Sequence, residues 1–252
     1  MDSKIALITG GSRGIGRDAA IRLAQKGNNI ILTYHSKATE ATAVVAEIEA
    51  LGQNAVAMQL DVADIKSLPI FIEKIANVLH EKWHRSKFDF LINNAGTGAT
   101  IPFTQATEDD FDRLLNVHFK GVYFLTQKAL PLMNDQGSII NVSSGTTRFC
   151  NPGYSIYASM KGAMETLTKY LAKELGTRGI NVNIVAPGPI ETDFNNAFIR
   201  SNPEIKNRLA SFTALGRVGE ANDIGGIIAF LCSTDAKWIN AQRIEASGGV
   251  NI

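Results

Sequence analysis

The sequence predicts an α/β fold in which a doubly wound parallel sheet of about seven strands carries helices on both faces. Short runs rich in Val, Ile and Leu alternate with helix-length segments along almost the whole chain. Most of these runs are apolar throughout, as expected of strands that helices cover on each side. The 252 residues, of which 45% are hydrophobic, suffice for one large core, so we expect a single domain over residues 1–252.

Strands and helices are expected in regular alternation. The strands are expected at residues 5–9, 29–34, 54–60, 88–93, 137–143, 180–186 and 242–247, where β-branched and other apolar residues concentrate. The helices are expected at residues 14–26, 38–51, 64–82, 107–133, 153–176 and 221–232. Each helical segment is long enough for the crossover that joins two parallel strands.

Residues 188–216 are the least regular part of the chain. They contain two prolines and the large apolar residues Phe194, Phe198, Leu209 and Phe212. A long apolar insertion that follows a buried strand predicts a lid over a substrate. A pair of ordinary packed helices is the alternative.

Charge and cysteine content narrow the class of partner. Lys+Arg 25 against Asp+Glu 24 gives a formal net charge of +1, which offers no overall basic surface for nucleic acid or an anionic membrane. Cys150 and Cys232 lack metal-ligand or disulfide spacing, and His80 and His84 have no evident third ligand, so we expect no metal. No apolar run reaches the about 20 residues of a membrane span. We expect a cytoplasmic protein that acts on a small molecule.

A glycine-rich loop joins the first expected strand to the first expected helix. It reads TGGSRGIG over residues 9–16, and Gly10, Gly14 and Gly16 allow the tight turn and close backbone approach that a pyrophosphate requires. The N–H groups and the positive end of the following helix would bind the phosphate charge. This context predicts a Rossmann-type dinucleotide site, and a tight strand-to-helix turn without a ligand is the alternative.

The segment YSIYASMKG, residues 154–162, raises the question of which tyrosine is catalytic. On a helix Tyr157 lies about 6 Å from Lys161 along the axis and on the same face, whereas Tyr154 lies about 10 Å away. An ammonium beside a phenol in a partly desolvated cleft would lower the pKa of Tyr157 from about 10 toward neutral. Tyr157 is therefore the candidate proton donor, although a YxxxK spacing also occurs by chance on many helices.

Further motifs follow in an order that resembles one family over essentially the whole chain. They are TGGSRGIG, LDV at 60–62, NNAG at 93–96, YASMK at 157–161 and VNIVAPGPIETDF at 182–194. Asn116 lies in LLNVHFKGVY, and Ser144 precedes Tyr157 by thirteen residues. On this set of motifs the chain is identified as a member of the short-chain dehydrogenase/reductase family.

The resemblance implies an oxidoreductase that moves a hydride between a nicotinamide and a substrate carbonyl carbon. Ser144 and Tyr157 would hydrogen-bond the carbonyl oxygen, and Tyr157 would transfer the proton. Lys161 would lower the pKa of Tyr157 and hold the nicotinamide ribose. Asn116 would hold a water of the proton relay or, alternatively, only kink its helix. These four are the catalytic residues that the resemblance implies.

We expect NADPH as the preferred cofactor. No carboxylate lies between Asp18 and Glu40, where an acidic residue after the second strand would favour NAD. A 2′-phosphate could be bound by Arg13, Ser36 and Lys37. The alternative is that Arg13 and Lys37 are solvated surface charges. The resemblance implies a cofactor site made of Gly10, Ser12, Arg13, Gly14, Ile15, Gly16, His35, Ser36, Lys37, Asp61, Val62, Asn93, Ala95, Gly96, Tyr157, Lys161, Pro187, Gly188, Ile190 and Thr192.

The expected substrate pocket is apolar. Phe149, Tyr154, Phe194 and Phe198 favour a ketone or keto ester, with plain core packing as the alternative. Arg148 would meet a substrate carboxylate or remain a surface charge. The resemblance also implies a homotetramer built from the helices at 107–133 and 153–176 and the last strand region.

Three other functions remain open at this point. The first is reduction of a 3-oxoacyl thioester, although PLMNDQGSII lacks the basic run that an acidic carrier protein would contact and only Arg178 is available nearby. The second is NAD-dependent oxidation of an alcohol, sugar or steroid. The third is a cofactor-sensing regulator without turnover, because fold alone does not establish activity.

Overall fold

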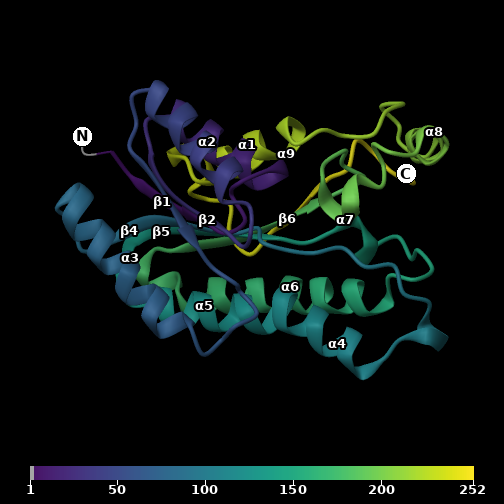
Figure 1. Ribbon diagram of the computed structural model, residues 1–252, viewed down its shortest axis with the longest axis horizontal. Helices are drawn as coiled ribbons and strands as arrows, with labels where there is room; N and C mark the ends of the chain where they lie inside the picture. The colour runs from purple at the N-terminus through teal and green to yellow at the C-terminus, as the bar shows by residue number, and fades with distance from the viewer. Residues whose placement is uncertain (1–2) are drawn as a thin grey trace.

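The computed structural model describes residues 3–252 and confirms the predicted fold class. Within this range seven parallel strands form one sheet in the order β3-β2-β1-β4-β5-β6-β7 (Figure 1). The strands are β1 Ile5–Ile8, β2 Asn29–Tyr34, β3 Ala55–Gln59, β4 Phe88–Asn93, β5 Met133–Val142, β6 Asn181–Pro187 and β7 Arg243–Ala246.

Helices cover both faces of the sheet. In Figure 1 one layer holds α1 Gly14–Gln25, α2 Ala38–Ala50 and α9 Asn222–Leu231. The opposite layer holds α3 Leu68–Trp83, α4 Glu108–Leu115, α5 Gly121–Ala129 and α6 Ser155–Glu174. The short helices α7 Phe194–Ala197 and α8 Pro203–Ser211 lie beyond the end of the sheet, near the C-terminus. Single 3₁₀ turns lie at Phe103–Gln105, Leu130–Leu132, Gly145–Thr147, Gly176–Arg178 and Thr234–Ala236.

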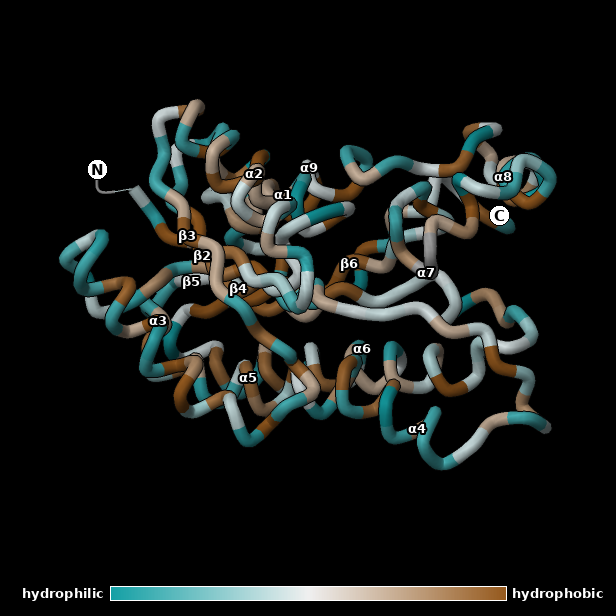
Figure 2. Tube along the Cα trace, in the orientation of Figure 1, coloured by the Kyte–Doolittle hydropathy of each residue, from teal (hydrophilic) through white to brown (hydrophobic). Residues whose placement is uncertain are grey.

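Alternation along the strands divides the core into two layers. Ala6 and Ile8 of β1 pack in the cluster beneath α1, α2 and α9, whereas Ile5 and Leu7 pack in the cluster beneath α3 and α5. All four side chains have no exposed surface. Figure 2 shows hydrophobic residues concentrated along the strands between the helix layers. The uniformly apolar runs of the sequence are therefore strands buried on both faces.

Two expected helix boundaries are wrong for local reasons. The helix expected at 64–82 begins at Leu68, with Pro69 in its first turn, where a missing backbone N–H costs nothing. The helix expected at 107–133 is interrupted by a π-helix at Asn116–Lys120 and ends before Met133, where β5 already begins. Gly121 follows the π-helix, and a Cβ there would lie 2.2 Å from the carbonyl oxygen of Val62.

The strand order reverses direction beside β1. The chain runs outward from β1 through β2 to β3, and then returns to pair β4 with the other edge of β1. Connections at the carboxyl ends of β1 and β4 therefore diverge and leave a crevice, which is where open parallel sheets bind ligands. Among residues 3–252, no helix combines the length and apolar character needed to cross a membrane.

A buried chain of polar side chains ties the sheet to two helices. The amide of Asn93 on β4 donates to Asn141 Oδ1 on β5 at 2.9 Å and to Thr126 Oγ1 on α5 at 3.1 Å. The amide of Asn141 donates in turn to Thr168 Oγ1 on α6 at 2.9 Å. Hydrogen bonds between buried side chains favour one arrangement of the elements that carry them, because each donor needs its partner in place. These hydrogen bonds hold α5 and α6 against the carboxyl ends of β4 and β5.

Asn141→Ala should lower the free energy of unfolding by about 2–4 kcal/mol, because it removes buried hydrogen bonds and leaves a cavity. Urea unfolding at one protein concentration measures this change. Asn207→Ala, at an exposed position of α8, is the control and should change it by less than about 0.5 kcal/mol. Equal effects of the two substitutions would contradict the structural role of the buried chain.

Candidate active site

A cavity of about 1170 Å³ opens at the carboxyl edge of the sheet. It is lined by the loops that follow β1, β2, β4, β5 and β6, by α6 and by the segment that carries α7 and α8. Pockets for one small ligand commonly occupy about 300–1,000 Å³. The cavity is therefore large enough for a dinucleotide together with a substrate.

The loop between β1 and α1 is shaped to hold phosphate. Gly10 and Gly14 have φ values of 66° and 56°, in the left-handed region that favours glycine. At Gly16 a Cβ would lie 2.2 Å from the carbonyl oxygen of Gly10, so only glycine lets α1 start this close to the loop. No side chain caps the N-terminus of α1. Its first N–H groups are therefore available to an anion, and the loop fits a pyrophosphate.

Most of the expected cofactor residues line this one cavity. They are Gly10, Ser12, Arg13, Gly14, Ile15, His35, Ser36, Lys37, Asp61, Val62, Ala95, Gly96, Tyr157, Lys161, Pro187, Gly188, Ile190 and Thr192. Gly16 lies behind the loop and contributes by close packing instead.

Asn93 is a correction to the expected site. Its side chain points into the core and bonds to Asn141 and Thr126, and the residue is only 4% exposed. The next residue takes the expected place, because successive residues of a strand point to opposite sides. Asn94 lines the cavity, and its amide donates to the carbonyl oxygens of Thr9 at 2.9 Å and Gly10 at 3.0 Å. Asn94 therefore fixes the glycine loop against the end of β4.

Three of the four expected catalytic side chains meet on one wall of the cavity. Tyr157 and Lys161 lie one turn apart on α6, and Lys161 Nζ is 5.7 Å from the centre of the Tyr157 ring. Ser144 follows the end of β5 and lies next to the Tyr157 hydroxyl, whose pKa it lowers. The backbone N–H and hydroxyl of Thr146 lie 3.2 and 3.0 Å from Ser144 Oγ and donate to it. These two contacts fix the orientation of the Ser144 hydroxyl beside Tyr157.

Asn116 stands apart from these three. It begins the π-helix, and its carbonyl oxygen accepts the backbone N–H of Gly121, five residues later. It does not line the cavity. The expected irregularity of this helix is therefore present as a π-turn, a feature often found near functional sites.

Known proteins share both this sequence and this arrangement. The family described as enoyl-(acyl carrier protein) reductase matches residues 10–251. The 3-oxoacyl-(acyl-carrier-protein) reductase FabG of Staphylococcus aureus is 38% identical over 250 residues, which cover 98% of each chain. Two solved structures superpose with a TM-score of 0.94 at 36% identity. One is the promiscuous reductase LugOII, which catalyses a keto-reduction at C1 in lugdunomycin biosynthesis and is covered to 98%, with 99% of this chain. The other is the angucycline C-6 ketoreductase LanV with bound NADP, covered to 95%, with 98% of this chain.

The chain belongs to the short-chain dehydrogenase/reductase family. The resemblance seen in the sequence is thus confirmed, and the motifs that carried it meet around one cavity. Its fold and its glycine loop are those of a nucleotide-binding protein.

The pKa of Tyr157 is shifted in the direction opposite to the one expected from the sequence. Burial raises the pKa of Tyr157 to about 12, against the lowering effect of its hydrogen bond to Ser144. Burial also lowers the pKa of Lys161 to about 8. The Lys161 ammonium donates to the Val142 carbonyl oxygen at 2.7 Å, so it is turned to the end of β5 and not to the phenol. In this short-chain dehydrogenase/reductase the phenol therefore holds its proton at neutral pH.

The expected substrate residues form the outer part of the cavity. Phe149, Tyr154, Phe194 and Phe198 all line it. The rings of Tyr154 and Phe194 each lie 6.3 Å from the ring of Tyr157. Phe194 and Phe198 are 43% and 46% exposed, so plain core packing does not explain these two residues. α8 adds Ile205, Arg208 and Leu209 to the lining.

Arg148 is occupied on the protein. Its guanidinium lies 2.7 Å from Glu245 Oε1 and 5.2 Å from the centre of the Phe149 ring. Arg148 does not line the cavity. Of its two expected roles, the structure therefore gives it that of a surface charge.

His118 is a site residue that the sequence analysis missed. It is 1% exposed, and its ring meets the Tyr157 ring edge to face with centres 5.0 Å apart. Its Nε2 lies 2.8 Å from the carbonyl oxygen of Thr97, which follows the NNAG segment. Burial, and then the nearby Lys161 charge, lower the pKa of His118 to about 3. The position two residues after Asn116, on a buried helix turn, was the available signal.

His118 should remain neutral throughout the pH range 5–8, and its ring proton resonances should not titrate there. Proton NMR spectra of the unmodified protein and of His118→Asn, recorded under the same conditions, identify the resonances that belong to His118. Because the unfolded chain binds a proton near pH 6.5 and the folded chain does not, His118 should also destabilise the fold as pH falls below about 6.5. A midpoint for His118 between pH 5 and 8 would contradict its burial beside Lys161.

Proposed function

We propose that this protein is an NADPH-dependent carbonyl reductase that converts a ketone or keto ester into a secondary alcohol. One observation carries the proposal. The phenol of Tyr157, next to Ser144, faces the same cavity as the uncapped N-terminus of α1. A proton donor and a phosphate site in one cavity are what a reductase with a dinucleotide cofactor needs.

The residues of the cavity would divide the work as follows. When bound, NADPH supplies the hydride. Ser144, oriented by Thr146, would donate a hydrogen bond to the substrate oxygen, and Tyr157 would donate its proton to the same oxygen as negative charge develops. The ammonium of Lys161 would stabilise the resulting phenolate electrostatically. Asn116 is proposed to support the water path behind Lys161.

The loop after β2 supports NADPH as the cofactor. His35, Ser36, Lys37 and Arg13 all line the cavity, and no carboxylate follows β2 before Glu40. Lys37 Nζ lies 3.7 Å from Glu40 and Arg13 is exposed, so neither cation is buried in another role. The bound NADP of LanV agrees with this preference.

The aromatic outer cavity supports an apolar or aromatic ketone. LugOII catalyses a keto-reduction and LanV is a ketoreductase, which supports a ketone as the substrate. Reduction of a 3-oxoacyl thioester is the second candidate because of the 38% identity to FabG. Against it, Arg178 is bound to Asp135 at 2.8 Å and to the carbonyl oxygens of Leu130 and Met133, which occupies the one basic residue expected to meet a carrier protein.

The proposal extends to the domain organisation, association and location of the protein. We infer a single domain, with residues 188–216 as a lid whose α7 and α8 border the substrate side of the cavity. Exposed Phe111, Tyr123 and Tyr170 on α4, α5 and α6 support the proposed homotetramer, because large apolar side chains in water favour association. The proposed cytoplasmic location rests on the cysteine pattern of the sequence.

Oxidation of NADPH and NADH at 340 nm, with 2-tetralone, ethyl acetoacetate, acetoacetyl coenzyme A and a sugar as substrates, tests the proposal. Faster turnover with NADPH and with either of the first two is expected. Preference for the thioester would favour the second candidate, and preference for NADH would favour an NAD-dependent dehydrogenase. Cofactor binding without turnover of any of these would favour a regulator.

Tyr157→Phe should lower kcat at least about 100-fold, because only the proton donor is removed. Its Kd for NADPH, measured by cofactor fluorescence, should stay close to that of the unmodified protein. Tyr170→Phe, at an exposed position of the same helix, is the matched control and should leave both quantities unchanged. Substantial turnover by Tyr157→Phe would remove Tyr157 from its assigned role.

Arg13→Ala should lower the ratio of kcat/KM for NADPH to that for NADH by about 10-fold or more, the effect of losing one charge-assisted hydrogen bond. Arg22→Ala changes a cation of α1, the helix that follows Arg13; Arg22 pairs with Asp18 and lies outside the cavity. That control should leave the ratio as it was. An unchanged ratio in Arg13→Ala would show that Arg13 does not contact the phosphate.

A further inference from the structure

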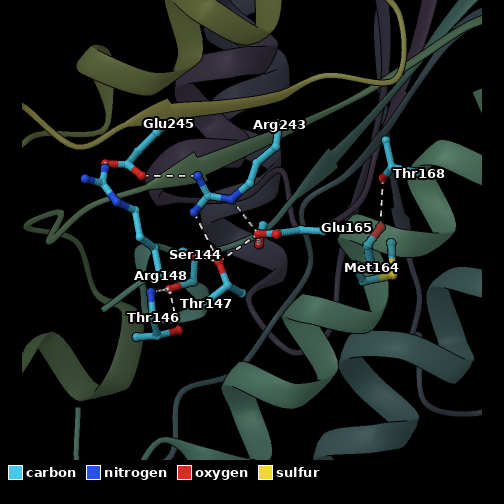
Figure 3. Close-up of polar contacts among 10 residues, drawn as sticks. Ser144, Thr146, Thr147, Arg148, Met164, Glu165, Thr168, Arg243 and Glu245 are labelled. Carbon is cyan, nitrogen blue, oxygen red and sulfur yellow. Dashed lines mark hydrogen bonds and ion pairs between the residues drawn. The ribbon is translucent and has the colours of Figure 1, made fainter. Parts of the chain in front are cut away.

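A network of charged and hydroxyl side chains lies beside Ser144 and Thr147 (Figure 3). Its centre is Glu165, which lies one turn beyond Lys161 on α6. Three donors converge on Glu165 Oε1. They are Ser143 Oγ at 2.6 Å, Thr147 Oγ1 at 2.8 Å and Arg243 Nε at 2.7 Å. The network thus joins α6 to the segment after β5 and to β7.

A second carboxylate completes the network on β7. Glu245 accepts from Arg243 at 3.1 Å, from Arg148 at 2.7 Å and from Ser247 at 2.8 Å. Burial acts to raise the pKa of Glu245, but these hydrogen bonds hold it below its ordinary value. Arg243 therefore lies between two carboxylates, one on α6 and one on its own strand.

The charges of this network are held away from bulk water. The side chains of Glu165, Arg243 and Glu245 are 19%, 23% and 18% exposed. Ion pairs that lose water contribute little net stability but require a defined geometry from their partners. The partners here are three elements that meet only through tertiary folding, because Glu165 and Arg243 are 78 positions apart.

The network reaches Ser144 from both sides along the chain. Ser143 precedes it and Thr147 follows it, and both contact Glu165. The Thr147 hydroxyl also lies 2.9 Å from the Ser144 carbonyl oxygen, so its one proton is shared between this oxygen and Glu165. Arg243 donates to Thr147 Oγ1 at 3.1 Å. The backbone of Ser144 is consequently fixed relative to α6, the helix that presents Tyr157.

We propose that Glu165 is a positioning residue, which together with Arg243 fixes the Ser144 segment against α6 at the distance that proton transfer requires. The inference rests on the proposed function, in which Ser144 and Tyr157 share the substrate oxygen. Glu165 does not line the cavity and contacts no substrate. Its effect on the rate passes through Ser144, and a displacement of about 1 Å at such a position costs about 100-fold in rate.

A double-mutant cycle tests this route. With NADPH and 2-tetralone or ethyl acetoacetate, whichever the unmodified protein reduces faster, Glu165→Ala should lower kcat about 10-fold to 100-fold. In a Ser144→Ala background the same substitution should lower kcat less than about threefold, because residues that act through one group are not additive. Glu165→Gln keeps an acceptor oxygen, so it should recover most of the activity that alanine loses.

Two further measurements separate positioning from general damage to the fold. The Kd for NADPH and the midpoint of thermal unfolding should stay close to those of the unmodified protein in Glu165→Gln. The Kd should also stay close in Glu165→Ala, even if its unfolding midpoint falls, because Glu165 does not line the cavity. Glu174→Ala, at an exposed position of the same helix, is the matched control and should leave kcat unchanged. A merely structural role would lower stability without making the loss in kcat depend on Ser144.

The outcomes distinguish this inference from the proposed function. An equal fall in kcat with and without the Ser144 hydroxyl, or no fall in either Glu165 variant, would overturn the positioning role while leaving the reductase assignment intact. Full activity of Ser144→Ala itself would instead overturn the catalytic assignment of Ser144 and, with it, the route on which the inference depends.

Discussion

The contact between the Lys161 ammonium and the carbonyl oxygen of Val142 is the interaction on which the site depends. It is 2.7 Å long and buried, and a hydrogen bond to a charged group contributes about 1.5–3 kcal/mol. It fixes the register of α6 against the end of β5. Tyr157 lies one turn before Lys161, and Ser144 lies two residues after Val142, so this one contact brings the two groups together. The Asn93, Asn141 and Thr168 chain beneath it and the Glu165 network beside it hold the same two elements.

The same contact explains the charge state of the site. An ammonium that donates to a backbone carbonyl leaves the Tyr157 phenol to the effect of burial, which keeps it protonated. A reductase needs a proton donor that is protonated before the hydride is transferred. His118, beside the phenol, is kept neutral because burial and the charge of Lys161 lower its pKa. The proposed phosphate site lies elsewhere, at the N-terminus of α1, because the sheet reverses its strand order beside β1. The acid and anion sites are thus close in one cavity without competing.

The sequence predicted the fold and most of the cavity for physical reasons. Strands apolar on both faces, a glycine loop between strand and helix, and a tyrosine and lysine one helical turn apart are local patterns. It failed where tertiary contacts decide. Strand periodicity alone does not say whether Asn93 or Asn94 faces the cavity. The direction in which the Tyr157 pKa shifts depends on which acceptor the Lys161 ammonium contacts. No local sequence pattern predicts the contact between Glu165 and Arg243, because it forms only when α6 and β7 come together in the folded protein.

In the proposed reaction a hydride passes from NADPH to a carbonyl carbon in this cavity while Tyr157 supplies the proton. NADPH labelled with deuterium at C4 on one face, and then on the other, measures the first half of this directly. With one of the two labelled cofactors, mass spectrometry should find deuterium on the carbinol carbon of the alcohol formed, and the Tyr157→Phe protein should form almost none of it. Alcohol without deuterium from either cofactor would contradict the account.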